Sequence, residues 1–266
     1  MKQEIGKVLW NTIECSGYFR MGLAASPAYA DARPGQFVMI RFCDRMVPFL
    51  RRPFSIHRLI ETEEGIGGFE ILYKVVGDGT EKLSGCRKGD RLDILGPLGN
   101  SFRIPENAGH FFVVAGGIGV APMYFLTDWL RRKGIELSDC RVFIGGRTKD
   151  DLLCTNDFFR SGVHTVQIAT DDGSAGNREL VTGPLERALQ EKRPDMIYAC
   201  GPIPMLKAVA EISQKHCLPC QVSVETMMAC GMGACLGCAM RKKDDSQKYF
   251  HACTDGPVFD AGHLLW

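Results

Sequence analysis

The sequence lacks three features that would assign it to large classes of proteins. It has almost no net charge, with 32 lysines and arginines against 31 aspartates and glutamates, so nothing favours nucleic acid as a partner. No apolar run approaches the length that spans a bilayer. The first residues, MKQEIGKVLW, lack the apolar core of a signal peptide. We therefore expect a cytoplasmic protein that binds neither nucleic acid nor membranes.

Internal repeats, low-complexity linkers and paired histidines are missing as well. The six histidines are isolated along the chain, and we expect each of them to be structural or on the surface. With 266 residues and 45% hydrophobic content, the chain is long enough for one large domain or two to three small ones.

The first segment, residues 1–102, contains short alternating apolar runs separated by Gly, Pro and Asp. Examples are GQFVMIRF (35–42), FEILYKVVG (69–77) and DRLDILGPLG (90–99). Short strands with turn signals between them are typical of an antiparallel β-barrel or sandwich.

The second segment, residues 103–220, alternates strands with helices. The strand HFFVVAGG (110–117) precedes a helix over 121–134, and the pattern continues to the end of the segment. Such alternation predicts a parallel α/β sheet with helices on both faces. Further strands are expected at 141–146, 165–173 and 195–202, and further helices at 183–192 and 203–216.

The third segment, residues 221–266, is too small for an apolar core of its own and holds four cysteines. Cys230, Cys235, Cys238 and Cys253 have the spacing C-x4-C-x2-C-x14-C. This is the plant-type [2Fe–2S] spacing, and Gly231 and Gly233 permit a close approach of backbone N–H groups to the cluster. We expect an iron–sulfur cluster domain, with zinc as the alternative occupant.

The remaining cysteines carry weaker signals. Twelve cysteines are many, but a reducing compartment disfavours a disulfide framework. Cys217 and Cys220 form a CxxC that could be a redox pair or half of a metal site, and we favour neither. Five others are expected to be small buried hydrophobes: Cys15, Cys43, Cys86, Cys140 and Cys154.

The stretch RRPFSI (51–56) resembles the Arg-x-aromatic-Ser flavin signature of the ferredoxin–NADP reductase superfamily. The resemblance implies that Arg52 pairs with the FAD pyrophosphate, in keeping with the bidentate contacts that arginine makes with phosphate. Phe54, which follows Pro53, would pack beside the flavin ring, and the Ser55 hydroxyl would act near flavin N5. Taken alone, the motif could also be a strand with a proline at a sheet edge.

The stretch YKVVGDGTEKLS (73–84) resembles the second flavin segment of that superfamily, in which a glycine-rich turn opens a short helix. Gly79 and Thr80 would offer N–H groups and a hydroxyl to the pyrophosphate. A plain hairpin turn at GDG is the alternative. The strand residues expected to contact FAD are Tyr73, Lys74 and Val75.

Two further turns resemble the nicotinamide-binding part of the superfamily. AGGIGVAPM (115–123) matches its GGxGxxP turn, which admits the cofactor phosphates at a helix N-terminus, although a plain strand–helix connection is possible. ACGPIPML (199–206) matches the turn that lines the nicotinamide beside the flavin. The residues implied are Gly116, Gly117, Gly119, Pro122, Cys200, Gly201 and Pro202.

Three residues of the second segment have a specific expected role. Cys200 would pack beside the reacting carbon and is not expected to be a nucleophile, because no histidine neighbours it in sequence. Asp171 and Asp172 stand where NADP-using relatives carry Ser and Arg. Their carboxylates would repel a 2′-phosphate and accept ribose hydroxyls, which predicts NAD(H), although an N-cap or loop role is possible.

The order of flavin, nicotinamide and cluster segments resembles the electron-transfer subunit of the NAD-dependent class of dihydroorotate dehydrogenase, over essentially the whole chain. The resemblance implies a β-barrel that binds FAD, an α/β domain that binds NAD(H), and a [2Fe–2S] domain. It also implies a partner, an FMN-containing catalytic subunit that holds the dihydroorotate site, within a heterotetramer of pyrimidine (UMP) biosynthesis.

Two other functions stay open at this point. Similar FAD and [2Fe–2S] subunits serve bifurcating transhydrogenases and sulfur-reducing hydrogenases, some of which replace a cluster cysteine with a carboxylate. The four cysteines present here favour the dihydroorotate complex. A non-redox binding module with a zinc-stapled tail is the second alternative.

Overall fold

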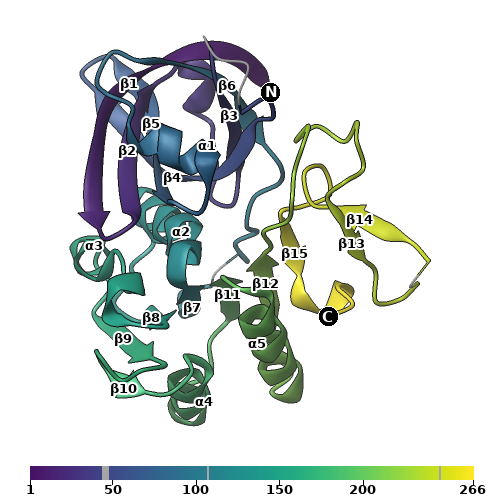
Figure 1. Cartoon of the computed structure of the whole chain (residues 1–266). Coiled ribbons are helices and arrows are strands. Elements are labelled where there is room, and N and C mark those ends of the chain that lie inside the picture. Colours follow the sequence, from purple (N-terminus) through teal and green to yellow (C-terminus); the bar gives the residue numbers. More distant parts are fainter. Residues whose placement is uncertain (44–47, 107, 246) are drawn as a thin grey trace.

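The computed structural model describes residues 1–43, 48–106, 108–245 and 247–266. Figure 1 shows a barrel at the N-terminal end of the chain, a sheet flanked by helices in the middle, and a small C-terminal segment beside both. None of the helices in this described part is long and apolar enough to cross a bilayer.

The N-terminal segment is a closed antiparallel barrel with strand order β1-β2-β5-β4-β3-β6, which confirms the predicted barrel. Its interior is filled by large apolar side chains such as Phe69 and Ile71, because alternate residues of each strand point inward, and Tyr29 of the turn after β2 packs with them. A short helix, α1 (Asp78–Ser84), follows β5, so the alternative of a plain hairpin turn at GDG is wrong. The strands are β1 (Lys2–Cys15), β2 (Tyr18–Ala24), β3 (Phe37–Phe42), β4 (Arg52–Thr62), β5 (Gly65–Lys74) and β6 (Arg91–Leu98), and the 3₁₀ turn η1 (Pro27–Tyr29) follows β2.

The central segment is a seven-stranded sheet with order β10-β9-β8-β7-β11-β12-β15. All its strand pairs are parallel except β12 with β15, which is antiparallel. The strands are β7 (Phe111–Gly116), β8 (Arg141–Gly146), β9 (Thr165–Thr170), β10 (Asn177–Arg178), β11 (Met196–Cys200), β12 (Cys220–Ser223) and β15 (Val258–Asp260).

Helices cover both faces of this sheet, as predicted. Phe111 and Val113 of β7 pack with α2 and α3, whereas Phe112 and Val114 pack with α4 and α5, because successive strand side chains point to opposite faces. The helices are α2 (Val120–Arg132), α3 (Thr155–Arg160), α4 (Thr182–Glu191) and α5 (Ile203–Lys215), with 3₁₀ turns η2 (Gly117–Gly119) and η3 (Lys149–Asp151).

The strand order reverses between β7 and β11. From β7 the chain proceeds outward through β8 and β9, and it then returns to place β11 on the other side of β7. In open α/β sheets ligands bind outside the carboxyl ends of the strands at such a switch point. The predicted turns at 115–123 and 199–206 follow β7 and β11, so both lie at this point.

The C-terminal segment contains a small hairpin, β13 (Ala239–Arg241) with β14 (Tyr249–His251), and ends in the turn η4 (Ala261–His263). Its apolar residues join one core with barrel and sheet residues, as expected for a tail without a core of its own. Strand β15 extends the central sheet, so the sheet crosses the expected boundary at 220. The division into segments 1–102, 103–220 and 221–266 stays a prediction.

Candidate functional site

A cavity of about 320 Å³ lies where the barrel meets the sheet. Three of the predicted flavin residues from β4, Arg52, Phe54 and Ser55, line it together with Thr80 of α1. Phe54 meets Tyr73 edge to face with ring centroids 5.8 Å apart. The other predicted residues on its wall are Pro53, Tyr73 and Lys74.

Arg52 lies against the start of α1. A Cβ added to Gly79 would be 2.7 Å from the Arg52 Nε, so a side chain at position 79 would push the guanidinium away. The Thr80 hydroxyl accepts a hydrogen bond from the N–H of Val76 at 2.9 Å and holds the glycine-rich turn in place. Gly79 thus lets the arginine stay at the entrance of the cavity, as a phosphate-binding arginine requires.

The cavity has a polar group that suits a ligand. The Thr226 Oγ1 is buried on the cavity wall and has no hydrogen-bond partner among the described residues. Buried polar atoms are normally paired, so this hydroxyl is left for a bound molecule. Aromatic walls, an arginine at one end and a free hydroxyl together fit a flavin nucleotide, and the residues therefore fit FAD.

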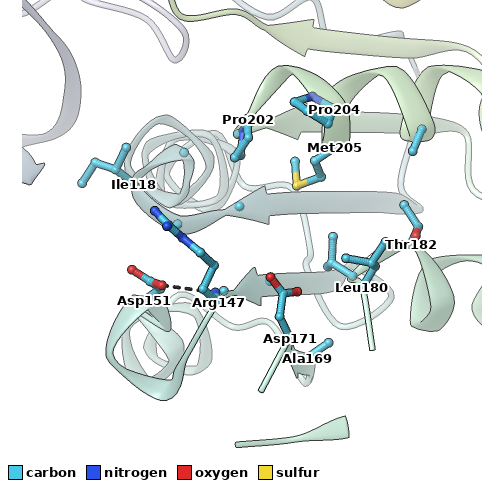
Figure 2. Close-up of a pocket in the computed structure, with 18 of the residues that line it drawn as sticks. Ile118, Arg147, Asp151, Ala169, Asp171, Leu180, Thr182, Pro202, Pro204 and Met205 are labelled. Carbon is cyan, nitrogen blue, oxygen red and sulfur yellow. Dashed lines mark hydrogen bonds between the residues drawn. The ribbon is translucent and has the colours of Figure 1, made fainter. Parts of the chain in front are cut away.

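A second cavity of about 600 Å³ lies at the carboxyl ends of the sheet strands. Its floor contains Gly116, Gly117 and Gly119 after β7, and Gly201 and Pro202 after β11. Figure 2 shows the turn residues Pro202 and Met205 on one side of the cavity and Asp171 on the other. The cavity thus occupies the switch point, where the sequence predicts the nicotinamide cofactor.

The two turns of the floor touch through their backbones. A Cβ on Gly119 would lie 2.3 Å from the Cys200 carbonyl oxygen, and a Cβ on Gly201 would lie 3.0 Å from the Gly116 backbone. Only glycine permits this approach. The glycines therefore bring β7 and β11 together and leave backbone at the surface of the floor.

Cys200 lies beneath this floor. It is almost fully buried, and burial, with the nearby Glu225 carboxylate, raises the pKa of its thiol well above the ordinary value. It is therefore a neutral thiol and not a nucleophile. Cys200 is absent from both cavity walls as the described residues define them, so its expected place beside the reacting carbon stays a prediction.

The carboxylates that line the second cavity are not the pair that the sequence predicted. Asp171 lines the cavity, whereas Asp172 is exposed and accepts bonds from the N–H and hydroxyl of Ser174 at 2.9 and 2.6 Å. Glu179, which the sequence analysis missed, supplies a second carboxylate to the wall and is held by Arg187. Asp171 thus places an acidic group on this wall, whereas Arg187 balances the charge of Glu179 and Arg147 lines the same cavity.

The two cavities adjoin, because Lys74, Ile118 and Glu225 line both. Glu225 follows β12 and is exposed to the groove between the cavities, yet protein atoms surround its carboxyl group on most sides, and this desolvation raises its pKa. Sequence reasoning missed it, although its place at the carboxyl end of a sheet strand was a usable signal.

Three of the predicted cluster cysteines, Cys230, Cys235 and Cys238, lie in the loop before β13, and the fourth, Cys253, follows β14. The Sγ atoms of Cys238 and Cys253 are 3.3 Å apart, and both residues are buried. Backbone N–H groups point at the sulfurs, from Gly233 to Cys253 at 3.2 Å and from Cys235 to Cys230 at 3.4 Å. Such N–H···S contacts tune iron–sulfur sites, and they hold the loop in the shape that the spacing implies.

Three residues of the loop have a positive φ, which glycine adopts freely and other residues adopt only with strain. Gly231 and Gly233 have φ of 72° and 82°, and Leu236 has φ of 57°. A Cβ on Gly231 would also lie 2.5 Å from Met39 of the barrel. Gly231 therefore serves both the turn and the close packing of the loop on the barrel.

The sulfurs do not converge on one point as zinc requires. Four sulfurs around a zinc ion lie about 3.8 Å from one another. Among the described residues, the possible metal-ligand atoms of His57, Cys154 and Asp157 lie within 4.8 Å of one another. No three of the loop cysteines bring their sulfurs that close together. A two-iron cluster, which separates its ligands into two pairs, fits the loop better.

The set of His57, Cys154 and Asp157 is itself a poor cation site. The guanidinium of Arg20 donates a hydrogen bond to Asp157 at 2.7 Å and lies 4.0 Å from the Cys154 Sγ. A metal ion there would meet a fixed positive charge. We therefore assign this cluster to the packing between the barrel and α3.

The cluster loop continues directly from the flavin cavity. Thr226 and Met228 line that cavity, and Cys230 follows two residues later. In the same segment Cys235 is exposed, and so are the apolar side chains of Met227 (82%), Met232 (47%) and Leu236 (58%). The loop therefore begins on the wall of the flavin cavity and carries exposed apolar residues among its cysteines.

Some predicted residues lie outside both cavities. Val75 and Pro122 are absent from the two cavity walls as the described residues define them. Cys217 is exposed and Cys220 is buried in β12, and both are free thiols, so the CxxC gains no role. The expectation of a buried hydrophobe is confirmed for Cys140 but wrong for Cys43, which is exposed at the point where the chain leaves β3.

Comparison with known proteins agrees with this geometry. Residues 225–265 match the family model of the iron–sulfur cluster binding domain of dihydroorotate dehydrogenase B, and residues 113–211 match the oxidoreductase NAD-binding domain. The dihydroorotate dehydrogenase B (NAD(+)) electron transfer subunit of Desulforamulus reducens is 39% identical over 88% of this chain and 87% of its own length. That of Enterococcus faecalis is 36% identical over 99% and 98%.

Solved structures show the same architecture. A subunit of an NADH-dependent reduced ferredoxin–NADP oxidoreductase, described for flavin-based electron bifurcation, superposes with a TM-score of 0.83 at 31% identity, over 99% of this chain and 90% of its own. A ferredoxin–NADP⁺ reductase from Neisseria gonorrhoeae, with TM-score 0.66 at 15% identity over 81% and 92%, shares the fold alone. The chain belongs to the family of electron transfer subunits of dihydroorotate dehydrogenase B (NAD(+)).

Proposed function

We propose that this chain receives electrons from an FMN-containing catalytic subunit that oxidises dihydroorotate, and that it delivers them to NAD⁺ within a heterotetramer. The chain is an oxidoreductase subunit with FAD, [2Fe–2S] and NAD(H) as cofactors. The observation that supports the proposal best is the adjacency of its sites: the cluster loop adjoins the flavin cavity, and that cavity shares wall residues with the nucleotide cavity. When bound, FAD would supply the chemistry that converts single electrons from the cluster into a hydride for the nicotinamide.

The residues of the chain divide the binding work. Arg52 offers its guanidinium to the pyrophosphate of FAD, and the Ser55 hydroxyl and Phe54 ring face the flavin. The remaining FAD contacts proposed are Pro53, Tyr73, Lys74, Val75, Gly79 and Thr80. The floor of the nucleotide cavity presents backbone N–H groups to the NAD(H) phosphates, as strand–helix turns do in other nucleotide sites.

The cofactor specificity proposed is for NAD(H). Asp171 accepts ribose hydroxyls and repels a 2′-phosphate, and Asp172 contributes its charge from outside the cavity. The other residues proposed at this site are Gly116, Gly117, Gly119, Pro122, Cys200, Gly201 and Pro202. The cluster ligands proposed are Cys230, Cys235, Cys238 and Cys253.

The exposed residues of the cluster loop suit the catalytic subunit. Met227, Met232 and Leu236 expose apolar side chains in the same segment as the exposed Cys235. Exposed apolar patches on such surfaces mark interaction sites, and contact here would bring the partner beside the cluster. The expected cytoplasmic location stays a prediction.

The direct test is an absorption spectrum of the anaerobically purified chain before and after NADH is added. Flavin bands with a broad red-shifted cluster absorption, both bleached by NADH, would support the proposal. A colourless protein that contains zinc would overturn it. Adding the catalytic subunit, dihydroorotate and NAD⁺ should then produce NADH.

The docking surface is tested with Leu236→Lys and Met232→Lys. Each should lower dihydroorotate-dependent NADH formation while NADH-dependent bleaching of the isolated chain stays unchanged. Ile13→Lys on the barrel, which is 70% exposed, is the matched control. Equal losses in all three variants would contradict a docking role for the loop.

A partner from a bifurcating enzyme is the second candidate, because of the likeness to the subunit of the ferredoxin–NADP oxidoreductase. The dihydroorotate relatives share more of the sequence, 36% and 39% against 31%. Dihydroorotate-dependent NADH formation with the catalytic subunit distinguishes the two, because a bifurcating partner would not supply it.

A further inference from the structure

A three-residue network joins the barrel to the α/β segment where the two cavities meet. The Tyr18 hydroxyl of β2 donates a hydrogen bond to Asp151 Oδ1 at 2.5 Å. The Lys74 ammonium of β5 donates to the Tyr18 oxygen at 2.7 Å and to Asp151 Oδ1 at 3.0 Å. Tyr18 and Lys74 belong to the barrel, and Asp151 belongs to η3 after β8. The network therefore links the barrel to the α/β segment.

The network is part of the cavity wall. Tyr18, Lys74 and Asp151 all line the nucleotide cavity, and Lys74 also lines the flavin cavity. Asp151 also accepts a hydrogen bond from the Arg147 N–H at 3.1 Å, a contact drawn in Figure 2. The carboxylate therefore holds the loop after β8 and the barrel at the same time.

The chemistry of the three groups keeps the network charged and rigid. Hydrogen bonds from Tyr18 and Lys74 lower the pKa of Asp151 despite its partial burial. The bond to Tyr18 raises the pKa of Lys74. Charge-assisted hydrogen bonds of this kind are stronger and more directional than neutral ones, and the Tyr18 ring is buried, which holds its hydroxyl in one place.

We propose that Tyr18, Lys74 and Asp151 form a positioning network that holds the nicotinamide cavity in register with the flavin cavity for hydride transfer. The inference rests on the proposed assignment of the two cavities. The flavin belongs to the barrel and the nicotinamide to the sheet, so the relative placement of the two segments sets the distance over which the hydride moves. A misplacement of about 1 Å between reacting groups costs about 100-fold in rate.

The test compares Asp151→Asn and Tyr18→Phe with the wild-type chain that holds FAD and cluster. Neither residue lines the flavin cavity. Both variants should keep the wild-type FAD content, and an NADH titration of each variant gives the concentration that saturates it. At saturating NADH, flavin bleaching should be about 10- to 100-fold slower, and the long-wavelength charge-transfer absorption between nicotinamide and flavin should weaken.

Asp157→Asn is the matched control. Asp157 of α3 pairs with Arg20 of β2 at 2.7 Å, so it also joins the barrel to the α/β segment, but it lies outside both cavity walls as described. NADH should bleach the flavin of the Asp157→Asn variant at the wild-type rate. The double variant Tyr18→Phe/Asp151→Asn should be no slower than the slower single variant, because the residues act as one unit.

Three results would overturn the inference: wild-type bleaching by Asp151→Asn, an equal slowing by Asp157→Asn, or single-variant effects that multiply in the double variant. A wild-type chain that binds FAD but is not bleached by NADH would instead overturn the proposed function itself. The two failures are therefore distinguishable.

Discussion

The floor of the nucleotide cavity provides a sharp prediction through Gly119→Ala. The added methyl group would lie 2.3 Å from the Cys200 carbonyl oxygen and 2.7 Å from the Gly201 nitrogen, about 1 Å short of an ordinary contact. Gly119 has φ of −59°, so alanine adds no backbone strain at this position. The effect therefore comes from the collision alone.

The neighbouring atoms are backbone and cannot move aside as a flexible side chain would. Overpacking of this kind costs about 1 to 3 kcal/mol of unfolding free energy, which corresponds to a lower Tm by several degrees. The turn after β11 must also shift away from the turn after β7, and both line the cavity. A shift of about 1 Å predicts NADH-dependent flavin bleaching slower by about 100-fold.

Anaerobic stopped-flow absorption measures the bleaching rate, and thermal unfolding measures the Tm. Gly109→Ala is the matched control, because a Cβ there meets nothing within 4 Å among the residues that the structure describes. FAD and iron content should be unchanged in both variants. Wild-type bleaching and Tm in Gly119→Ala would refute the view that glycine at this position holds the two turns together.

Three further predictions concern the other sites. Cys253→Ser should lose the iron and the red-shifted absorption while FAD stays bound, whereas Cys217→Ser should retain both; iron analysis decides. Asp171→Asn should reduce the preference for NADH over NADPH by about tenfold, through removal of a like charge, as steady-state kinetics with both cofactors would show. Burial, assisted by the positive charge of Arg20, lowers the pKa of His57 from 6.5 to about 3. The folded state therefore stays unprotonated while the unfolded state gains a proton, so stability present above pH 6.5 falls as the pH drops toward 3, by about 2 kcal/mol between pH 6.5 and about pH 5. His57→Gln should flatten this slope in denaturant titrations, and an unchanged slope in that variant would contradict the burial argument.

The local signals of the chain were predictable because each depends on short-range chemistry. The cysteine spacing, the glycines of the turn at 115–123 and the RRPFSI stretch are each confined to a few neighbouring residues. The alternation of strands and helices follows from the period of apolar residues. For this reason the barrel, the α/β sheet and most element positions agree with the structure, with helix α2, for example, at Val120–Arg132 against the expected 121–134.

The motifs and their spacing were enough to predict the cofactors, their order along the chain and the family, whereas the fold was needed to show how residues far apart in the chain combine. Glu225 lies between two cavities, and Tyr18 contacts Asp151, a residue 133 positions away. Asp171 enters the nucleotide cavity while its neighbour Asp172 turns to Ser174, and β15 returns to extend the sheet beside β12. Such pairings depend on chain topology and on the direction of each side chain, which residue type and spacing do not specify.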